Sequence, residues 1–372
     1  MTARPAADLP MEAYVAALAA LDEVGPSRLR WLLSLGAPAE VWGRLRAGRL
    51  PVAPNVPPAL APRWAVADVD PARVWSRCAD LGVGVTCLGG PGYPAALVGD
   101  PDPPVVLFHL GDPDVLVRPR VAVVGTRRAT PYGRQVARDL GHDLAGAGVC
   151  VVSGLALGID AAAHRGAVAV GPDGASAGAA AVVGSGLDAP CPRANRDLCA
   201  AVADGGVVLS EVPPGVAGAP WRFPVRNRVL AGLAQAVVVV ESTGSGGSMH
   251  TVREALDRDV PVLAVPGPVQ SPVSAGPHEL IGDGAALCTG ARDVLDLLGL
   301  GEGVAPTPDP RPEPLGAAGA VLAAAGWLPT PVSYLAQAVD LPVVQVLAEV
   351  ESLRRDGWVE VADGTVLRRS RP

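Results

Sequence analysis

The stretch "VAVVGTRRATPYG", residues 121–133, begins as an apolar run, breaks at Gly125 and continues with two adjacent arginines. Continuous apolar runs with helix-length gaps between them are typical of a parallel sheet that is buried on both faces. The pattern therefore predicts a Rossmann-like, doubly wound α/β domain. Five further runs of this kind follow along the chain: "VCVVSG" at 149, "AAVVGSG" at 180, "GVVLSE" at 206, "AVVVVES" at 236 and "PVLAVPG" at 261.

The composition suits a globular chain of several domains. Its 372 residues are 49% hydrophobic, the formal net charge is -7, and all 30 cationic side chains are arginines because the sequence has no lysine. This excludes a Walker A lysine and a Schiff-base lysine. Residues 118–142 nevertheless form a basic island. The six cysteines show no zinc-site spacing and no metal or other cofactor is expected. No signal sequence or membrane span is recognised, so we expect a cytoplasmic protein without membrane contact.

The N-terminal part, residues 1–70, is predicted to be a small helical module. Helical spacing covers much of residues 11–50, and residues 51–70 are a proline-rich connection. The pattern "LDEVGPSRLRWLLSLG" is typical of a helix-hairpin-helix or SAM-like module, whose glycine turn can hold a DNA phosphate. A helical packing module with the same turn is the alternative.

The C-terminal part follows a proline-rich linker at residues 301–314. Residues 315–372 contain an apolar helix, a helix-turn-helix and a terminal hairpin with Asp363-Gly364 at its tip. This order is the winged-helix plan. Its positive and negative charges nearly cancel, so both DNA contact and protein docking remain open. The domain between the two terminal modules is predicted to span residues 71–300.

The loops after the predicted strands should gather at one edge of the sheet, where ligands bind in such folds. These loops supply glycines, hydroxyl groups and arginines, a set that suits a polyanion. The string "WRFPVRNR" adds Trp221, Arg222 and Phe223, the pairing of cation and aromatic ring that suits unstacked bases. Alternatively, Arg226 and Arg228 only pair with acids around the sheet.

Enzymatic readings are weaker. The turn after residue 124 lacks the dinucleotide fingerprint, and the five histidines lie in no nucleophile-elbow or HExxH pattern. His164 follows Asp160 by four residues, which is typical of a packed helical histidine. "GSGGSMHTVREAL" slightly resembles the loop of cytokinin-releasing phosphoribohydrolases, with Glu254 in the place of their glutamate. A nucleotide-processing hydrolase is therefore kept as the rival to a non-enzymatic protein.

Five motifs in order resemble the DprA (Smf) family of natural transformation. They are "VAVVGTRRATPYG", "VVSGLALGIDAAAHRGA", "GSGLDAPCPRANRDL", "LSEVPPG…WRFPVRNRVLAGLA" and "SGGSMHTVREAL…VPVLAVPGPV". The resemblance covers residues 85–298 and implies a dimeric, non-catalytic protein of DNA recombination and competence. Such a protein binds single-stranded DNA without reading its sequence and loads RecA onto incoming DNA. Single-strand DNA-binding protein is a further candidate partner.

The resemblance also implies the DNA-binding residues. They are Gly125, Thr126, Arg127, Ser153, Gly154, Gly158, Asn195, Arg196, Phe223, Arg226, Asn227, Arg228, Gly246, Gly247 and Ser248. Arg127 and Arg226 are expected to contact backbone phosphates, while Arg128 is expected to point elsewhere. Leu157 stands where many relatives carry a basic residue, a departure that could shift binding toward Arg128, Arg134 and the winged helix.

Overall fold

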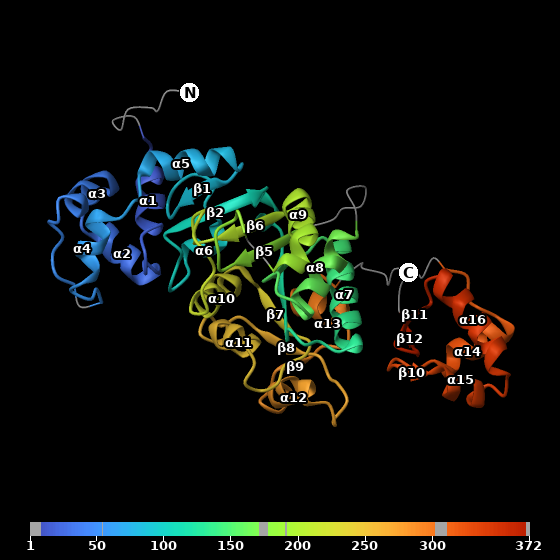
Figure 1. Cartoon of the computed structure of the whole chain (residues 1–372). Helices are drawn as coiled ribbons and strands as arrows, with labels where there is room; N and C mark the ends of the chain where they lie inside the picture. Colours follow the sequence, from blue (N-terminus) through green and yellow to red (C-terminus); the bar gives the residue numbers. More distant parts are fainter. Residues whose placement is uncertain (1–8, 54, 171–177, 190–191, 302–310, 370–372) are drawn as a thin grey trace.

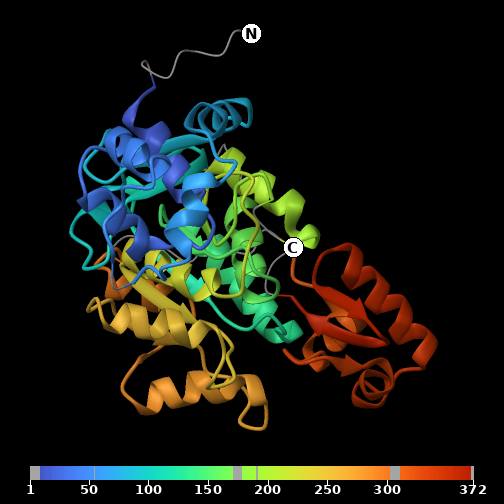
Figure 2. The same ribbon diagram turned by 60° about the vertical axis from the view of Figure 1, so that its left-hand side comes forward.

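The computed structural model describes residues 9–53, 55–170, 178–189, 192–301 and 311–369. A large sheet crosses the middle of the molecule, with helices on both of its faces (Figure 1). A group of helices lies at the N-terminal end, and a separate small unit formed by the C-terminal residues lies at the opposite end (Figures 1 and 2).

The central sheet has nine strands in the order β1-β2-β6-β5-β4-β3-β7-β8-β9. All neighbours from β6 to β9 are parallel, whereas β1 and β2 run antiparallel at one edge. The six predicted strands are confirmed as β3 to β8, and β1, β2 and β9 are additions. The strands are β1 (Gly84–Cys87), β2 (Val106–Gly111), β3 (Arg120–Val124), β4 (Cys150–Ser153), β5 (Ala179–Val183), β6 (Val207–Ser210), β7 (Ala236–Val239), β8 (Val262–Ala264) and β9 (Ala286–Leu287).

Alternate residues of the strands fill two separate cores. In β3, Val121 and Val123 pack in one core, whereas Ala122 and Val124 pack in the other. This alternation follows from the two-residue period of a strand and explains why the whole run is apolar. The first core is covered by α7 (Pro131–Gly146), α8 (Ile159–Val168), α9 (Arg196–Gly205) and α13 (Ala291–Leu297). The second is covered by α6 (Ala95–Val98), α10 (Arg222–Leu233), α11 (Ser248–Leu256) and α12 (Ala275–Gly282).

The N-terminal helices share the first core with the sheet. Leu18, Leu32 and Trp64 are buried in the same cluster as the strand residues. The turn at Gly25 lies against the ring of Trp221, since a Cβ added at Gly25 would be 3.3 Å from that ring. The helices are α1 (Met11–Ala19), α2 (Pro26–Ser34), α3 (Pro38–Arg46), α4 (Leu60–Val66) and α5 (Pro71–Asp80), of which α4 lies inside the segment expected to be a plain connection.

The C-terminal unit has a core of its own, which includes Val321, Leu335, Val346 and Trp358. The expected order of elements is confirmed, with Asp363 and Gly364 at positive φ in the hairpin turn. The linker predicted before this unit falls mainly on residues 302–310, outside the described residues. The elements are α14 (Gly316–Ala324), β10 (Thr330–Pro331), α15 (Val332–Ala338), α16 (Val343–Arg355), β11 (Val359–Ala362) and β12 (Thr365–Arg368), with the strands in the order β10-β12-β11.

The cysteines inside the described ranges are buried and form no disulfide, in agreement with the prediction of buried thiols: Cys78, Cys87, Cys150, Cys199 and Cys288. Burial raises the pKa of the Cys150 thiol to about 12, so it stays protonated at neutral pH. Cys191 lies outside the described residues. Within the described part of the chain, no helix is both long enough and apolar enough to span a membrane.

Candidate nucleic-acid interface

The turn between β3 and α7, residues 125–130, is held in place by Glu241 at the end of β7. The backbone N–H of Thr126 donates to the Glu241 carbonyl at 2.7 Å, and the N–H of Thr130 donates to its carboxylate at 2.9 Å. The hydroxyl of Thr130 caps α7 by accepting from the N–H of Gly133 at 3.0 Å. Gly125 serves this packing, because a Cβ there would collide with Ile159 and the Glu241 carbonyl. The turn is therefore a fixed platform for the two arginines that follow.

Arg127 and Arg128 are both exposed, and neither forms an ion pair within the described ranges. The Arg127 guanidinium lies over the ring of Phe223, 5.3 Å from its centroid. Arg128 was expected to point away, but it lines the same cavity as Arg127. Both charges are available to a ligand.

Two cavities lie beside this turn and share Arg127, Ala156, Phe223 and Arg226 as lining residues. The first has a volume of about 350 Å³ and the second about 290 Å³. We call the two together the edge groove, because it follows the carboxyl ends of the parallel strands. The first cavity is closed on its other sides by the loop at 246–248 and the start of α11, and the second by residues 183–185 and Leu157.

The loop between β4 and α8, residues 154–158, is fixed from three directions. The side-chain amide of Asn195 donates to the carbonyl of Leu155 at 2.9 Å. The carboxylate of Asp160 accepts from the N–H of Gly154 at 3.1 Å, and the Arg226 guanidinium donates to the Gly154 carbonyl at 3.0 Å. Asn195 is only 1% exposed, so its predicted DNA contact is replaced by a structural one.

Asp160 and Arg226 both line the first cavity and interact electrostatically. Burial raises the pKa of Asp160, and the nearby Arg226 and Arg127 act in the opposite direction. Burial also lowers the pKa of His164 to about 4, so this histidine is neutral at physiological pH, with its Nε2 3.3 Å from the Ala180 carbonyl. His164 is thus a packed core residue, as its spacing from Asp160 predicted.

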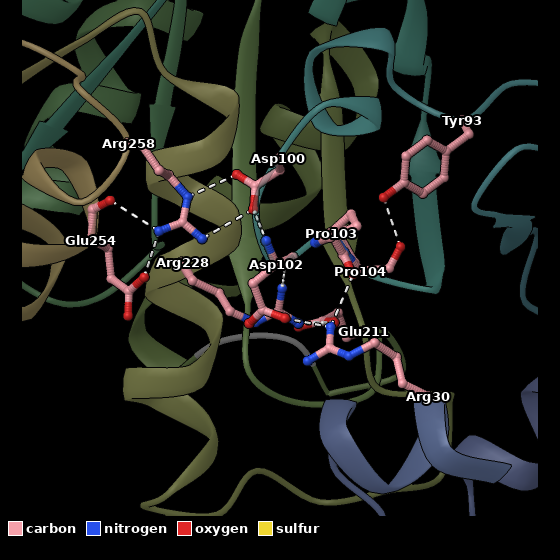
Figure 3. Close-up of polar contacts among 10 residues, drawn as sticks. All are labelled: Arg30, Tyr93, Asp100, Asp102, Pro103, Pro104, Glu211, Arg228, Glu254 and Arg258. Atoms are coloured by element: carbon pink, nitrogen blue, oxygen red, sulfur yellow. Dashed lines mark hydrogen bonds and ion pairs between the residues drawn. The ribbon is translucent and has the colours of Figure 1, made fainter. Parts of the chain in front are cut away.

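Arg228 is used by an ion-pair cluster away from the groove (Figure 3). Its side chain is 6% exposed and lies 3.2 Å from the carboxylate of Asp102, with a second, shorter ion pair to Glu211. Asp102 in turn pairs with Arg30 of α2, which ties the N-terminal helices to α10 (Figure 3). For Arg228, the alternative interpretation of the sequence agrees with the structure: this arginine pairs with acidic residues.

Glu254, the residue on which the hydrolase reading depends, belongs to a neighbouring cluster (Figure 3). Its carboxylate pairs with Arg258 at 2.7 Å, and Arg258 also pairs with the buried Asp100 at 2.7 Å. Glu254 does not line either cavity of the edge groove. Glu254 therefore pairs with Arg258 and does not face either cavity.

The predicted site residues divide into two groups. Ten line the edge groove: Gly125, Thr126, Arg127, Gly154, Phe223, Arg226, Asn227, Gly246, Gly247 and Ser248. The other five lie outside its lining: Ser153, Gly158, Asn195, Arg196 and Arg228. Ser153 is fully buried and donates to the Val123 carbonyl at 2.7 Å, whereas Arg196 is exposed at the start of α9.

Some residues of the edge groove and its support were not predicted from the sequence. His250 and Thr251 line the first cavity from the start of α11, and Glu241 positions the arginine turn from below. The polar loop after each strand was the signal that could have found them. Their spacing alone did not distinguish them from ordinary helix residues.

Comparisons with known proteins place this architecture among DNA-processing proteins. The family model described as DNA recombination-mediator protein A matches residues 84–299. Protein Smf of Escherichia coli is 36% identical over 291 residues, covering 74% of this chain and 75% of that protein. The crystal structure of DNA processing protein A from Streptococcus pneumoniae superposes with a TM-score of 0.64 at 31% identity, covering 77% of this chain and 96% of that one. The Helicobacter pylori protein, whose structure concerns its single-stranded DNA binding mode, gives 0.52 at 28% identity, covering 58% and 95%.

Proposed function

Because the chain belongs to the DNA recombination-mediator protein A family, we propose that its edge groove binds single-stranded DNA without sequence preference. Unpaired DNA offers a phosphate backbone and splayed bases together, and a groove with cations and an aromatic ring suits both. The rigid turn at residues 125–130 presents the cations, and Gly247, where an added Cβ would meet no atom within 4 Å, leaves room for the backbone of the strand.

The main support for the proposal is that Arg127 is exposed and has no acidic partner in the described residues. Its guanidinium lies over the ring of Phe223. An arginine held in this way can donate to a phosphate while the ring beside it stacks on a base. Arg128, in the same cavity, adds a second cation for the next phosphate.

The proposed DNA contacts are therefore narrower than the sequence-based set. Arg127, Arg128 and Phe223 make the side-chain contacts, and Thr126, Asn227 and Ser248 offer polar groups at the groove wall. Arg226 orders the loop at residues 154–158, and Arg228 holds the scaffold. The single-stranded DNA bound by the Helicobacter pylori protein supports this choice of ligand.

The wider role proposed here follows from family membership. The protein would act without catalysis, as a cytoplasmic dimer that delivers incoming single strands to RecA during natural transformation. Residues 1–70 would be the helix-hairpin-helix or SAM-like module, residues 71–300 the DNA-binding domain, and residues 315–372 a winged helix. Because Trp221 covers the turn at Gly25, we assign that module to packing in preference to phosphate binding.

The test is a salt titration of the binding of single-stranded and duplex DNA, with the wild type and Arg127→Ala. Single-strand affinity should exceed duplex affinity and should fall with salt, with a slope of about 0.7 per phosphate contact. Arg127→Ala should weaken binding by about 10-fold or more, since hydrogen bonds to charged groups contribute about 1.5–3 kcal/mol. Arg49→Ala, at an exposed arginine in the segment that follows α3, is the matched control.

Unchanged affinity and slope in Arg127→Ala would reject the site. The rival hydrolase predicts turnover of a nucleoside monophosphate that disappears in Glu254→Gln. Because Glu254 pairs with Arg258, we expect no turnover in either protein and normal DNA binding by the variant after correction for any lost stability.

A further inference from the structure

A third cavity of about 210 Å³ lies between the C-terminal hairpin and the helices α7 and α8. We call it the hairpin pocket. Figures 1 and 2 both show the C-terminal unit beside this side of the molecule. Its lining residues are Pro131, Arg134, Gln135, Arg138, Ala162, Arg165, Pro329, Glu360, Ala362, Thr365 and Leu367.

Three arginines converge on the hairpin pocket, and their charges are not balanced. Arg134, Arg138 and Arg165 are exposed, and none forms an ion pair within the described part of the chain. The Arg165 guanidinium makes only a 3.4 Å contact with the side-chain oxygen of Asn195. Glu360 is the one carboxylate in the described lining. Like charges gathered in this way repel one another unless an anion lies between them.

The convergence results from the packing of α7 against α8. Gly166 touches the backbone of α7 so closely that a Cβ there would collide with the Arg138 carbonyl. This close approach places Arg165 beside Arg138, and Arg134 lies one turn away on the same face of α7. Burial and the nearby charge of Arg138 lower the pKa of Arg369, which follows the hairpin, while Glu360 and Asp139 act in the opposite direction. The charges of α7 are therefore felt by the C-terminal unit across the pocket.

The hairpin pocket and the edge groove are built on the same two helices. Pro131, which lines the pocket, begins α7 directly after the turn that carries Arg127 and Arg128. On α8, Asp160 lines the groove and Ala162 lines the pocket. The groove and the pocket are therefore connected through the start of α7 and through α8.

We propose that the hairpin pocket is a second phosphate-binding site, which holds the backbone of a single DNA strand after it leaves the edge groove. This inference rests on the proposed function of the groove. The ligand is a phosphodiester chain: three guanidinium groups supply donors for its oxygens, and the hairpin covers the strand from the other side. The apolar lining residues are Pro131, Ala162, Pro329, Ala362 and Leu367, and no aromatic anchor for a peptide is among the described lining.

The test measures binding of the full-length protein to oligo-dT of two lengths. A strand of about 6 nucleotides should fill only the groove, and one of about 30 nucleotides should reach the pocket. Arg138→Gln with Arg165→Gln should weaken binding of the long strand by about 10-fold and reduce its salt slope by about 1.4, which is two contacts at 0.7 each. Binding of the short strand should not change. Arg49→Gln with Arg355→Gln removes the same charge from exposed positions elsewhere and should change neither.

A second variant acts in the opposite direction. Glu360→Gln removes the one carboxylate in the described lining of the pocket, so affinity for the long strand should rise by severalfold while the short strand is unaffected. A damaged fold would not produce this gain.

The outcomes separate this inference from the proposed function. Equal long-strand binding by the wild type and the double variant, with binding lost in Arg127→Ala, would overturn only the pocket. A deficit confined to duplex DNA would also overturn it. No binding of either strand by the wild type would reject the groove and the pocket together.

Discussion

Two arginine-bearing segments of the chain meet at the edge groove and have different roles. The turn at residues 125–130 presents Arg127 and Arg128 to solvent. Helix α10 carries Arg226 and Arg228, which are 8% and 5% exposed. The guanidinium of Arg226 donates to backbone carbonyls, and that of Arg228 pairs with Asp102 and Glu211.

The difference shows that residue type alone does not make a ligand. A buried guanidinium must be satisfied by the protein itself, because leaving its charge unpaired costs several kcal/mol. An exposed one on a rigid turn keeps its donors free. Substitutions of the buried Arg226 and Arg228 should therefore reduce stability, whereas those at the exposed turn, or at the exposed Phe223 near the start of α10, should reduce affinity.

The largest effect is expected for Arg228→Ala. It leaves the carboxylates of Glu211 and Asp102 without their shared partner, so the free energy of unfolding should fall by about 3–5 kcal/mol. Urea denaturation monitored by circular dichroism measures this, with Arg355→Ala as an exposed control that should change stability by less than about 0.5 kcal/mol. A loss below about 1 kcal/mol would remove the contrast between the two segments.

Arg226→Ala should lower the free energy of unfolding somewhat less, by about 2–3 kcal/mol, because it removes the guanidinium that donates to the carbonyls of Gly154 and Val182. Hydrogen exchange should also become faster in residues 154–158, which Arg226 helps to hold. If exchange in this loop stayed at the wild-type rate, Arg226 would be available to a ligand after all.

Phe223→Ala tests the prediction that the exposed residues of the groove contribute to DNA binding and little to stability. The ring is 38% exposed and lies beside Arg127, so stability should change little while single-strand affinity falls by about 1–3 kcal/mol through lost stacking. Fluorescence anisotropy with labelled oligo-dT measures the change. Phe223→Tyr keeps a ring and should bind almost as well as the wild type; equal weakening in both variants would argue against stacking.

The smallest effect concerns pH. Burial raises the pKa of Glu211 to about 7 from its ordinary value of 4.5. Between these values the folded protein keeps a proton that the unfolded chain has released, so the free energy of unfolding decreases as the pH rises through this window and levels off above it. This decrease should be lost in Glu211→Gln, because the amide does not titrate. Identical pH profiles in urea denaturation would mean that Glu211 stays ionised throughout.

Much of the fold could be predicted because β3 to β8 each contain a continuous run of buried apolar residues. Strands β1 and β9 were missed because they are short and partly exposed, and α4 lies among prolines. For the site, glycines and arginines after the strands indicated the right edge of the sheet. The ion pairing of Arg228 could not be predicted, because its partner Asp102 lies 126 residues away in the sequence. Only the folded chain brings the two together.

The core of the sheet and the core of the C-terminal unit are separate, so the two parts of the molecule should unfold at different temperatures. The N-terminal helices share the core of the sheet, so they should melt in the same cooperative step as the strands. The C-terminal unit buries its apolar residues by itself and can lose its structure without disturbing the sheet. Calorimetry would then give two transitions, and the hairpin could open and close over α7 and α8 while the arginine turn stays rigid.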